Sequence, residues 1–248
     1  MSTSNILSKK RKLKLKNFQK KYNLNFKDIE LLNRAFCHSS YVFENSLDEN
    51  LSYERLEFLG DAVLKLAISE ILYEQYPSYQ EGKLSKIRSQ TVSDRNISKY
   101  ARLMDFEDLI ILGKNEKSQG GSKKESILAC AFEALLGAIF LEYDKDGYKK
   151  ALEFLKENFL EDILSIEEMC DFLNPKAVLQ EYTQGLNSKL PEYITTKEEG
   201  PEHDKTFYVD VKYNNKIIGT GCAKSIKAAQ QKAALEAIEK LKIKPQDK

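Results

Sequence analysis

The chain has few cysteines and few histidines for its length. Its 248 residues include four cysteines, none in a Cys-x-x-Cys pair, and two histidines, His38 and His203. Scattered cysteines argue against a disulfide framework and a zinc site, and they fit a reducing cytoplasm, where we expect the protein. We assign His38 a packing or hydrogen-bonding role. No Ser–His–Asp or Cys–His arrangement suggests covalent catalysis, and we expect no organic cofactor.

Long hydrophobic runs are also absent. No apolar stretch approaches membrane-spanning length, and the basic amino-terminal segment lacks the apolar core and small-residue cleavage site of a secretory signal. We therefore expect no membrane partner. The hydrophobic fraction of 42% is still enough for a sizeable core, in one large domain or two smaller ones.

The hydrophobic pattern divides the chain in two. Up to about Ile166 the periods are helical, without strand-like alternation. After Asp171 a helix begins at Pro175, and strand-like segments and a final amphipathic helix follow. We predict an all-α domain followed by a small α+β domain of order α-β-β-β-α. The predicted helices cover 26–38, 53–76, 81–100, 124–143, 147–164, 174–184 and 225–241, and the predicted strands cover 191–197, 206–213 and 216–222, with a hairpin turn at Asn214-Asn215.

Acidic residues gather on one side of the predicted helix that begins near Tyr53. At about 100° per residue, Glu54, Glu57 and Asp61 fall within one narrow arc, opposite an apolar stripe. Like charges held that close repel, and a divalent cation would offset the cost. Taken alone, the helix could equally have a solvated acidic face. The apolar stripe consists of Leu56, Leu59 and Val63.

The helix predicted over 124–143 carries another acid in its segment 125–137. Cys130 and Glu133, spaced i and i+3, share one face of it. One acidic helix rarely makes a hydrolytic site alone, so we expect the two helices to contribute together. The buried stripe of the second helix consists of Leu128, Phe132, Leu135 and Ile139.

These segments resemble the ribonuclease III family, metal-dependent endonucleases that cut double-stranded RNA. Residues 53–64 resemble the family signature and residues 125–137 its second motif. The resemblance extends from about Phe18 to Leu241. Further matching segments are His38-Ser39-Ser40-Tyr41, Glu81-Gly82-Lys83-Leu84-Ser85 and Gly120-Gly121.

The resemblance implies roles for five acids. Asp61 and Glu133 would be catalytic, and with Glu57 they would bind Mg²⁺, for which Mn²⁺ could substitute. Glu54 and Glu81 match acidic positions of the family that assist at the same metal site. By the same resemblance the domain forms a homodimer with two cleavage centres, leaves short 3′ overhangs, and processes precursors of rRNA, mRNA and tRNA.

Cys130 departs from the family pattern, which has an Asp at the matching position. Mg²⁺ prefers hard oxygen ligands. A thiol is soft, and its unperturbed pKa of about 8.5 leaves it mostly protonated at neutral pH. Cys130 is thus either a weak member of the metal site or a partly buried helix residue, and the three remaining acids could still hold a cation.

The carboxy-terminal part resembles a double-stranded-RNA-binding domain in three segments, residues 175–182, 200–203 and 221–234. The first two would meet two minor grooves, and the start of the last helix would meet phosphates across the intervening major groove. Such domains read the shape of A-form RNA over about 16 base pairs. The implied RNA-binding residues are Lys176, Gln180, Glu181, Pro201, His203, Lys224, Ser225, Lys227 and Gln231.

Two positions of this module depart from the pattern. Ile226 stands where the family usually has a lysine, and Gln230 stands where a charged residue is common. Because fewer cations would then face the phosphates, we expect binding that is weaker and less salt-sensitive than usual.

The amino-terminal segment is basic. From Met1 to Phe26 the sequence has no acid. Such an arm could touch RNA phosphates, although for the first few residues we favour a frayed, solubilising tail. We predict this arm over 1–15, an endonuclease domain over 16–166, a linker over 167–173 and a double-stranded-RNA-binding domain over 174–245. The bases of the segment are Lys9, Lys10, Arg11, Lys12, Lys14, Lys16, Lys20 and Lys21.

Three functions remain open at this point. The leading one is an endoribonuclease that hydrolyses double-stranded RNA with divalent metal ions. The second is a duplex-RNA-binding dimer whose cleavage is weakened by Cys130. The third is a structural role, as in ribosomal proteins that resemble ribonuclease III, and the presence of all five acids argues against it.

Overall fold

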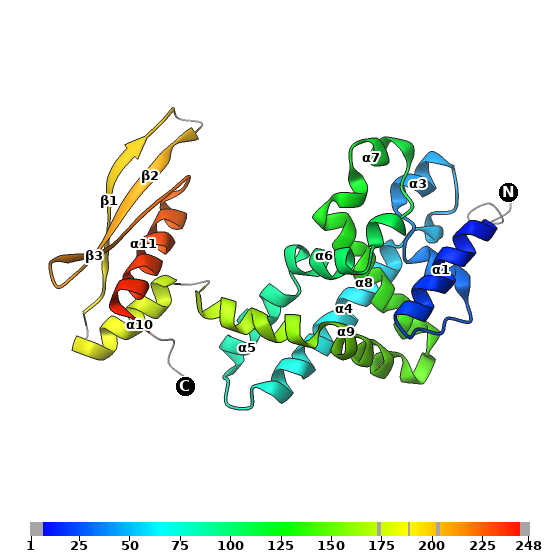
Figure 1. The fold of residues 1–248 in the computed structure, drawn as a ribbon, viewed down its shortest axis with the longest axis horizontal. Coiled ribbons are helices and arrows are strands. Elements are labelled where there is room, and N and C mark those ends of the chain that lie inside the picture. Colours follow the sequence, from blue (N-terminus) through cyan, green and yellow to red (C-terminus); the bar gives the residue numbers. More distant parts are fainter. Residues whose placement is uncertain (1–6, 173–174, 188, 202–203, 244–248) are drawn as a thin grey trace. The chain divides into compact units, whose positions relative to one another are not determined.

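The computed structural model describes residues 7–172, 175–187, 189–201 and 204–243. The chain divides into two compact units, with the boundary between Leu164 and Ser165 (Figure 1). Helices beginning in the first unit are α1 (Lys9–Lys21), α2 (Ile29–Arg34), α3 (Ser39–Glu44), α4 (Glu54–Gln75), α5 (Glu81–Thr91), α6 (Asp94–Leu103), α7 (Lys114–Ser118), α8 (Glu125–Glu142) and α9 (Gly147–Phe172). Short 3₁₀ turns lie at Glu49–Leu51, Phe106–Asp108, Gly121–Lys123 and Asp144–Asp146.

Helix α8 is the centre of the first unit. Between Ile127 and Ile139, every residue except Cys130 and Glu133 is buried. Helix α8 packs against both α4 and α6, which explains why it is apolar almost all round. The predicted all-α architecture is confirmed, because the strand-type pairing in the described part of this unit is a single bridge between Cys37 and Ile111.

Several helix boundaries differ from those predicted. The helix expected over 81–100 is two helices, because the chain turns at Val92 and Ser93. The Asn96 side-chain amide donates to the Gln90 carbonyl at 2.8 Å. Small polar residues favour such caps over helix interiors. The helix expected over 26–38 is confined to α2, whose start is capped by Asp28. Helices α1, α3 and α7 were not predicted.

Two helices enter segments for which another role is predicted. Helix α1 starts at Lys9 inside the predicted basic arm. Helix α9 continues to Phe172, through most of the predicted linker over 167–173. Glu167, Glu168 and Met169 are good helix formers, so the helix can continue through this stretch.

The second unit is a three-stranded antiparallel sheet with two helices, in the predicted order. The sheet order is β1-β2-β3, and Asn214 and Asn215 form the predicted turn, both with positive φ. Helix α11 lies directly on β3, where a Cβ at Gly221 would be 2.4 Å from the Ala229 carbonyl oxygen. The elements are α10 (Pro175–Asn187), β1 (Glu192–Glu199), β2 (Thr206–Tyr213), β3 (Lys216–Ala223) and α11 (Ile226–Leu241).

Among the described helices, none combines the length and the hydrophobicity that a membrane span requires.

Candidate functional site

Helices α4 and α8 cross with their backbones in contact. A Cβ at Gly60 would be 1.7 Å from the Glu133 carbonyl oxygen, and a Cβ at Gly137 would be 2.2 Å from the Leu56 carbonyl oxygen. Only glycine at both positions allows this approach. The crossing therefore places the residues beside Gly60 on α4 next to one face of α8. That face carries Cys130 and Glu133, which are only partly buried.

Carboxylates from both helices converge at this crossing. Burial, then the charges of Asp61 and Glu57, raises the pKa of Glu133 from 4.5 to about 7. Burial, together with the charges of Glu54 and Asp61, also raises the pKa of Glu57. A nearby cation is Lys65, whose ammonium is 2.8 Å from the Asp61 carboxylate. The group thus holds negative charge that the fold only partly compensates.

Cys130 lies inside this group as a neutral thiol. Burial and the charge of Glu57 raise its pKa to about 12, and its thiol donates a hydrogen bond to the Glu57 carboxylate. The side chain is therefore protonated at neutral pH. Cys130 therefore does not present a thiolate to this group.

Asp94 is an acid of the same group that the sequence pattern did not reveal. It is the first residue of α6, and its charge raises the pKa of Glu57, Cys130 and Glu133. In the sequence it looks like an ordinary acid in the first turn of a helix, where the helix dipole favours it. Only the packing of α6 on α8 brings it to the crossing.

The two accessory acids occupy different places. Glu54 is exposed at the start of α4, beside Glu57. Glu81 begins α5 and accepts a 2.7 Å hydrogen bond from the Ser85 hydroxyl. It also lines a cavity of about 410 Å³, whose wall includes Ser69 of α4. Ser69 is eight residues beyond Asp61, roughly 12 Å along a helix. Within one chain Glu81 is therefore set apart from the crossing.

The donor chemistry at the crossing suits a divalent metal ion. Glu57, Asp61 and Glu133 supply hard carboxylate oxygens, and their mutual repulsion would be relieved by a cation. Throughout the described ranges, no three Asp, Glu, His or Cys side chains are already grouped as a metal cluster. The Lys65 ammonium instead pairs with one oxygen of Asp61, Oδ2, at 2.8 Å.

The stability of the metal-free protein should fall as the pH rises. Folding raises the pKa of Glu133 from 4.5 to about 7, so the folded protein keeps a proton that the unfolded chain releases. Stability is then lost between those two pH values, on the order of 3 kcal/mol at most. Urea unfolding in EDTA at about pH 5 and about pH 8 measures this, and Glu133→Gln should remove most of the difference. An equal difference in the variant would assign the effect to other groups.

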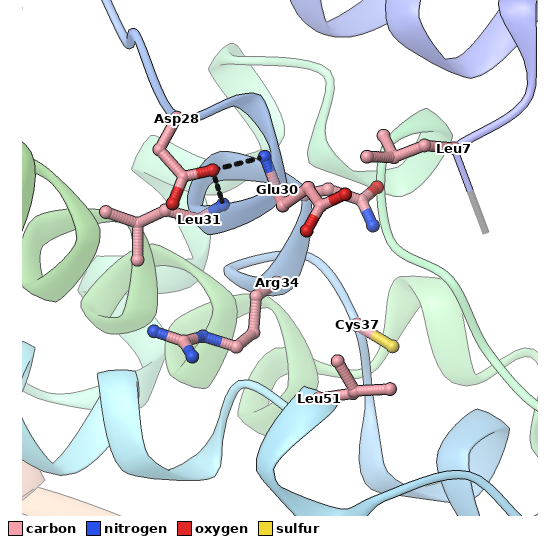
Figure 2. Close-up of a pocket in the computed structure, with 8 residues that line it drawn as sticks. Leu7, Asp28, Glu30, Leu31, Arg34, Cys37 and Leu51 are labelled. Carbon is pink, nitrogen blue, oxygen red and sulfur yellow. Dashed lines mark hydrogen bonds between the residues drawn. The ribbon is translucent and has the colours of Figure 1, made fainter. Parts of the chain in front are cut away.

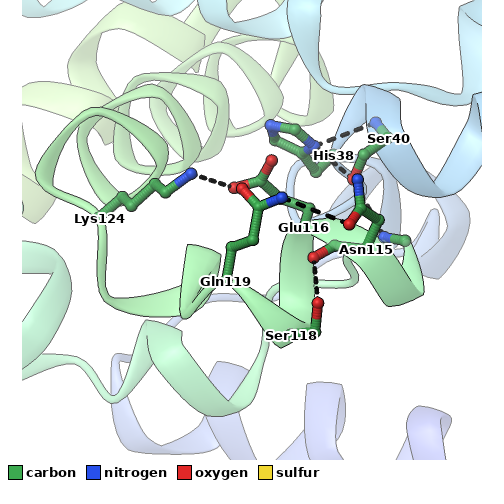
Figure 3. Close-up of polar contacts among 8 residues, drawn as sticks. His38, Ser40, Asn115, Glu116, Ser118, Gln119 and Lys124 are labelled. Carbon is green, nitrogen blue, oxygen red and sulfur yellow. Dashed lines mark hydrogen bonds and ion pairs between the residues drawn. The ribbon is translucent and has the colours of Figure 1, made fainter.

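His38 has the structural role predicted for it. Its Nδ1 accepts a hydrogen bond from the Ser40 amide at 3.0 Å, which caps α3 (Figure 3). Its ring packs edge-on against Tyr53. Burial lowers its pKa. Beside it, Glu116 of α7 pairs with Lys124 at 2.7 Å and ties α7 to the start of α8.

A smaller cavity of about 160 Å³ lies beside α2 (Figure 2). Its Asp28 carboxylate caps the helix by accepting from the Glu30 and Leu31 amides. It includes none of the predicted site residues. Its lining consists of Leu7, Asp28, Glu30, Leu31, Asn33, Arg34, Cys37 and Leu51.

The start of α11 presents the polar groups predicted for phosphate contacts. The Ser225 hydroxyl caps the helix by accepting from the Ala228 amide at 3.2 Å. Lys227 is exposed. Lys224 is exposed as well, but its ammonium is 2.7 Å from the Asp204 carboxylate. In the free protein, Lys224, one of the predicted RNA-binding lysines, is therefore paired with Asp204.

Two predicted RNA-binding residues hold the module together. The Lys176 ammonium donates to the Gln230 side chain at 2.6 Å and lies 4.5 Å from the centre of the Tyr193 ring. The Gln231 side chain accepts from the Lys176 amide at 3.3 Å. Of the other predicted RNA-binding residues, Gln180, Glu181 and Pro201 are exposed, and His203 lies outside the described residues.

A helical unit in which carboxylates of two helices converge is thus followed by an α-β-β-β-α module with a basic helix start. Comparison with known proteins identifies the family. Residues 28–163 match the family model described as ribonuclease-III-like, and residues 175–241 match the double-stranded RNA binding motif. The chain belongs to the ribonuclease III family, whose members use divalent metal ions.

Full-length relatives and a solved domain agree with this assignment. The chain is 41% identical over 246 residues to Ribonuclease 3 of Borreliella burgdorferi, covering 98% of both chains. It is 39% identical over 227 residues to Ribonuclease 3 of Enterococcus faecalis, covering 90% of this chain and 95% of that relative. The nuclease domain of ribonuclease III from Campylobacter jejuni matches 58% of this chain and 98% of its own at 36% identity, with a TM-score of 0.52. The protein is a double-stranded-RNA endoribonuclease, and the alternative of a weakened binding dimer is not favoured.

Proposed function

We propose that the carboxylates at the crossing of α4 and α8 bind Mg²⁺ and hydrolyse the phosphodiester backbone of double-stranded RNA there. The observation that carries this proposal is the partly buried, mutually repelling set Glu57, Asp61 and Glu133, carried by two helices whose backbones are in contact. A bound divalent ion would neutralise charge on the scissile phosphate and activate a water molecule.

The protein's own groups prepare this site. The Cys130 thiol lowers the pKa of Glu57 and so favours its carboxylate form, and burial keeps that thiol neutral. Lys65 partly neutralises Asp61 in the metal-free protein, with its ammonium 2.8 Å from the carboxylate. Glu133 releases its proton near neutral pH, because its pKa is about 7, and becomes an anionic ligand over the range in which the enzyme would work.

The same proposal includes a homodimer. Large apolar side chains are exposed on α3 and α4, with Phe43 88%, Phe58 83% and Tyr73 74% exposed. Exposed apolar surface of this kind marks association sites. The Campylobacter jejuni structure concerns a region involved in dimer formation of that nuclease domain. Because Phe58 follows Glu57 directly, a partner subunit that contacts Phe58 would lie near the acids of the crossing. Glu81 could then join this acidic site in the dimer.

In the cell, the proposed substrates are structured precursors of rRNA, mRNA and tRNA in the cytoplasm, cut to leave short 3′ overhangs. The second module supplies the affinity for duplex RNA and reads shape instead of sequence. The test is to incubate the pure protein with a long RNA duplex and with a single strand of the same sequence, in Mg²⁺. Cleavage confined to the duplex is expected. Equal cleavage of both RNAs, or of neither, would reject the proposal.

Replacing Cys130 by Asp should strengthen Mg²⁺ binding. A carboxylate adds a hard ligand where a neutral thiol stands, so cleavage at low Mg²⁺ should rise, and the wild type should gain more from Mn²⁺ than the variant does. Cleavage rates titrated with both metals measure this. Because Glu57 would lose its hydrogen bond from Cys130 and face a new charge, weaker binding would mean that the site has adapted to the thiol. An unchanged Mg²⁺ dependence would make Cys130 a packing residue.

Lys227→Ala should weaken duplex binding alike for all sequences. An exposed lysine at the start of α11 meets phosphate and not bases, so the salt slope of binding should fall by about one unit. Gel shifts of two unrelated duplexes at several salt concentrations measure it, with Lys232→Ala, exposed further along the same helix, as the control. A loss that depends on sequence would show that Lys227 reads bases.

A further inference from the structure

We propose that helix α1 carries a second contact surface for duplex RNA, on the nuclease unit itself. The surface is the lysine stripe, defined as Lys9, Lys12, Lys16 and Lys20. This inference rests on the protein's action on duplex RNA and goes beyond it, because it adds a binding site outside both the acids and the carboxy-terminal module.

One face of α1 is fixed to the unit. Leu15 and Phe18 are buried, and the Phe18 ring packs edge-on against Phe36 at 5.5 Å between ring centres. The Arg11 guanidinium is half-buried and donates to the Asn33 side chain at 2.8 Å and to the Leu109 carbonyl at 2.6 Å. The helix is therefore held in a set orientation, which fixes where its other faces point.

Two basic side chains on the flank of α1 are already engaged. The Lys21 ammonium pairs with Asp105 at 3.0 Å. The Lys14 ammonium donates to the Asp108 carbonyl at 3.3 Å. Asp105 and Asp108, in the turn beside α1, therefore contact Lys21 and Lys14. Neither contact involves a lysine of the stripe.

The lysine stripe faces solvent. Its residues are spaced by three, four and four positions, so they share one face over roughly 16 Å of helix. All four are exposed, and none has a side-chain hydrogen bond or ion pair within the ranges that the structure describes. The stripe is therefore a row of cations with no protein partner among those residues.

Such a row is costly for the free helix. Like charges at i and i+4 destabilise a helix, and the first turn of α1 carries Lys9, Lys10 and Lys12 with no acid, against the sign that the helix dipole favours. A polyanion laid along the stripe would offset both effects. Duplex RNA, with closely spaced phosphates, has the charge and the extended shape that fit.

An anionic lipid surface fits less well. A helix that lies on a membrane presents an apolar face beside its basic one. The apolar residues of α1 that could form such a face, Leu15 and Phe18, are buried in the unit, and Leu13 alone is exposed beside the stripe. The chemistry of the exposed face is therefore nearly all cationic.

The test uses the full chain with all four stripe lysines changed to glutamine, which keeps good helix propensity. Affinity for a long, labelled RNA duplex is measured in EDTA, to prevent cleavage, over a series of salt concentrations. We expect affinity to fall at least about tenfold and the salt slope to fall by roughly two to four units, about 0.9 for each phosphate that is no longer neutralised. A control removes the same charge from exposed lysines elsewhere in the unit, namely Lys27, Lys114, Lys117 and Lys145.

The outcomes separate the alternatives. An unchanged slope, or an equal loss in the control variant, would overturn the proposal and make the stripe a solvated face. Loss of binding to vesicles that contain phosphatidylserine, with RNA binding unchanged, would overturn it in favour of a lipid surface. Circular dichroism checks that α1 still folds. Because the readout is binding in EDTA, an absence of cleavage in Mg²⁺ would reject the proposed catalytic site and leave this inference standing.

Discussion

Glu133→Gln and Asp61→Asn are each expected to reduce duplex cleavage by roughly 10³-fold or more while leaving duplex binding nearly unchanged. Both substitutions remove an anionic oxygen from the crossing of α4 and α8 without changing side-chain size. The two acids lie in the nuclease unit, whereas the predicted duplex contacts come from the start of α11. Cleavage assays and gel shifts on the same duplex measure the two effects separately.

The matched control is Glu125→Gln. Glu125 is an exposed acid on α8, two helical turns before Glu133, so its loss changes the net charge equally without touching the crossing. It should retain nearly full activity. Full activity in Glu133→Gln or Asp61→Asn would sink the assignment of these acids, and loss of binding together with cleavage would indicate a damaged fold.

Gly60→Ala is expected to destabilise the nuclease unit by about 3 kcal/mol or more. The new Cβ would lie 1.7 Å from the Glu133 carbonyl oxygen and 2.9 Å from the Gly137 amide nitrogen. Both are backbone atoms, so relief requires the two helices to move apart and lose packing along their whole interface. The same movement would separate Asp61 from Glu133, so the metal affinity should fall as well.

Gly82→Ala provides the control for helix propensity. Gly82 lies in α5, and a Cβ there would meet nothing within 4 Å. Alanine should therefore leave stability unchanged or raise it by about 0.5–1 kcal/mol. Urea unfolding followed by far-ultraviolet circular dichroism compares the variants. If Gly60→Ala proved as stable as Gly82→Ala, the close approach of α4 to α8 would be wrong.

The sequence predicts the second unit better than the first. In the second unit, alternation along β2 and the Asn214-Asn215 turn are local signals, and the strand bounds match closely. In the first unit, the long helices α4 and α8 are amphipathic or apolar enough to be predicted. The short helices α3 and α7 depend on caps and packing, and local periodicity does not reveal them, whereas α2 lies inside the helix predicted over 26–38.

The candidate site shows the same division. Helical spacing on α4 and α8 places Glu57, Asp61 and Glu133 on faces that can meet, and the structure brings them together. Asp94 belongs to a third helix, and only tertiary packing shows that its charge acts on the group. The spacing of residues along a predicted helix also cannot show which neighbouring group each side chain contacts.

Two such partners change the prediction for individual residues. The Cys130 thiol donates to Glu57, and the Lys176 ammonium is engaged by Gln230. Because Lys176 serves the packing of α10 on α11, its replacement would test the fold of the module more than its contact with RNA. Lys224 and Lys227 are the more direct probes of phosphate binding.

The central claim is that the acids at the α4–α8 crossing cut duplex RNA with a divalent ion. The most direct measurement follows a long, end-labelled RNA duplex incubated with pure protein in Mg²⁺, beside the same reaction with Asp61→Asn. We expect short duplex products with 3′ overhangs from the wild type and intact, still bound duplex with the variant. Identical products from both proteins, or intact duplex with both, would contradict this claim.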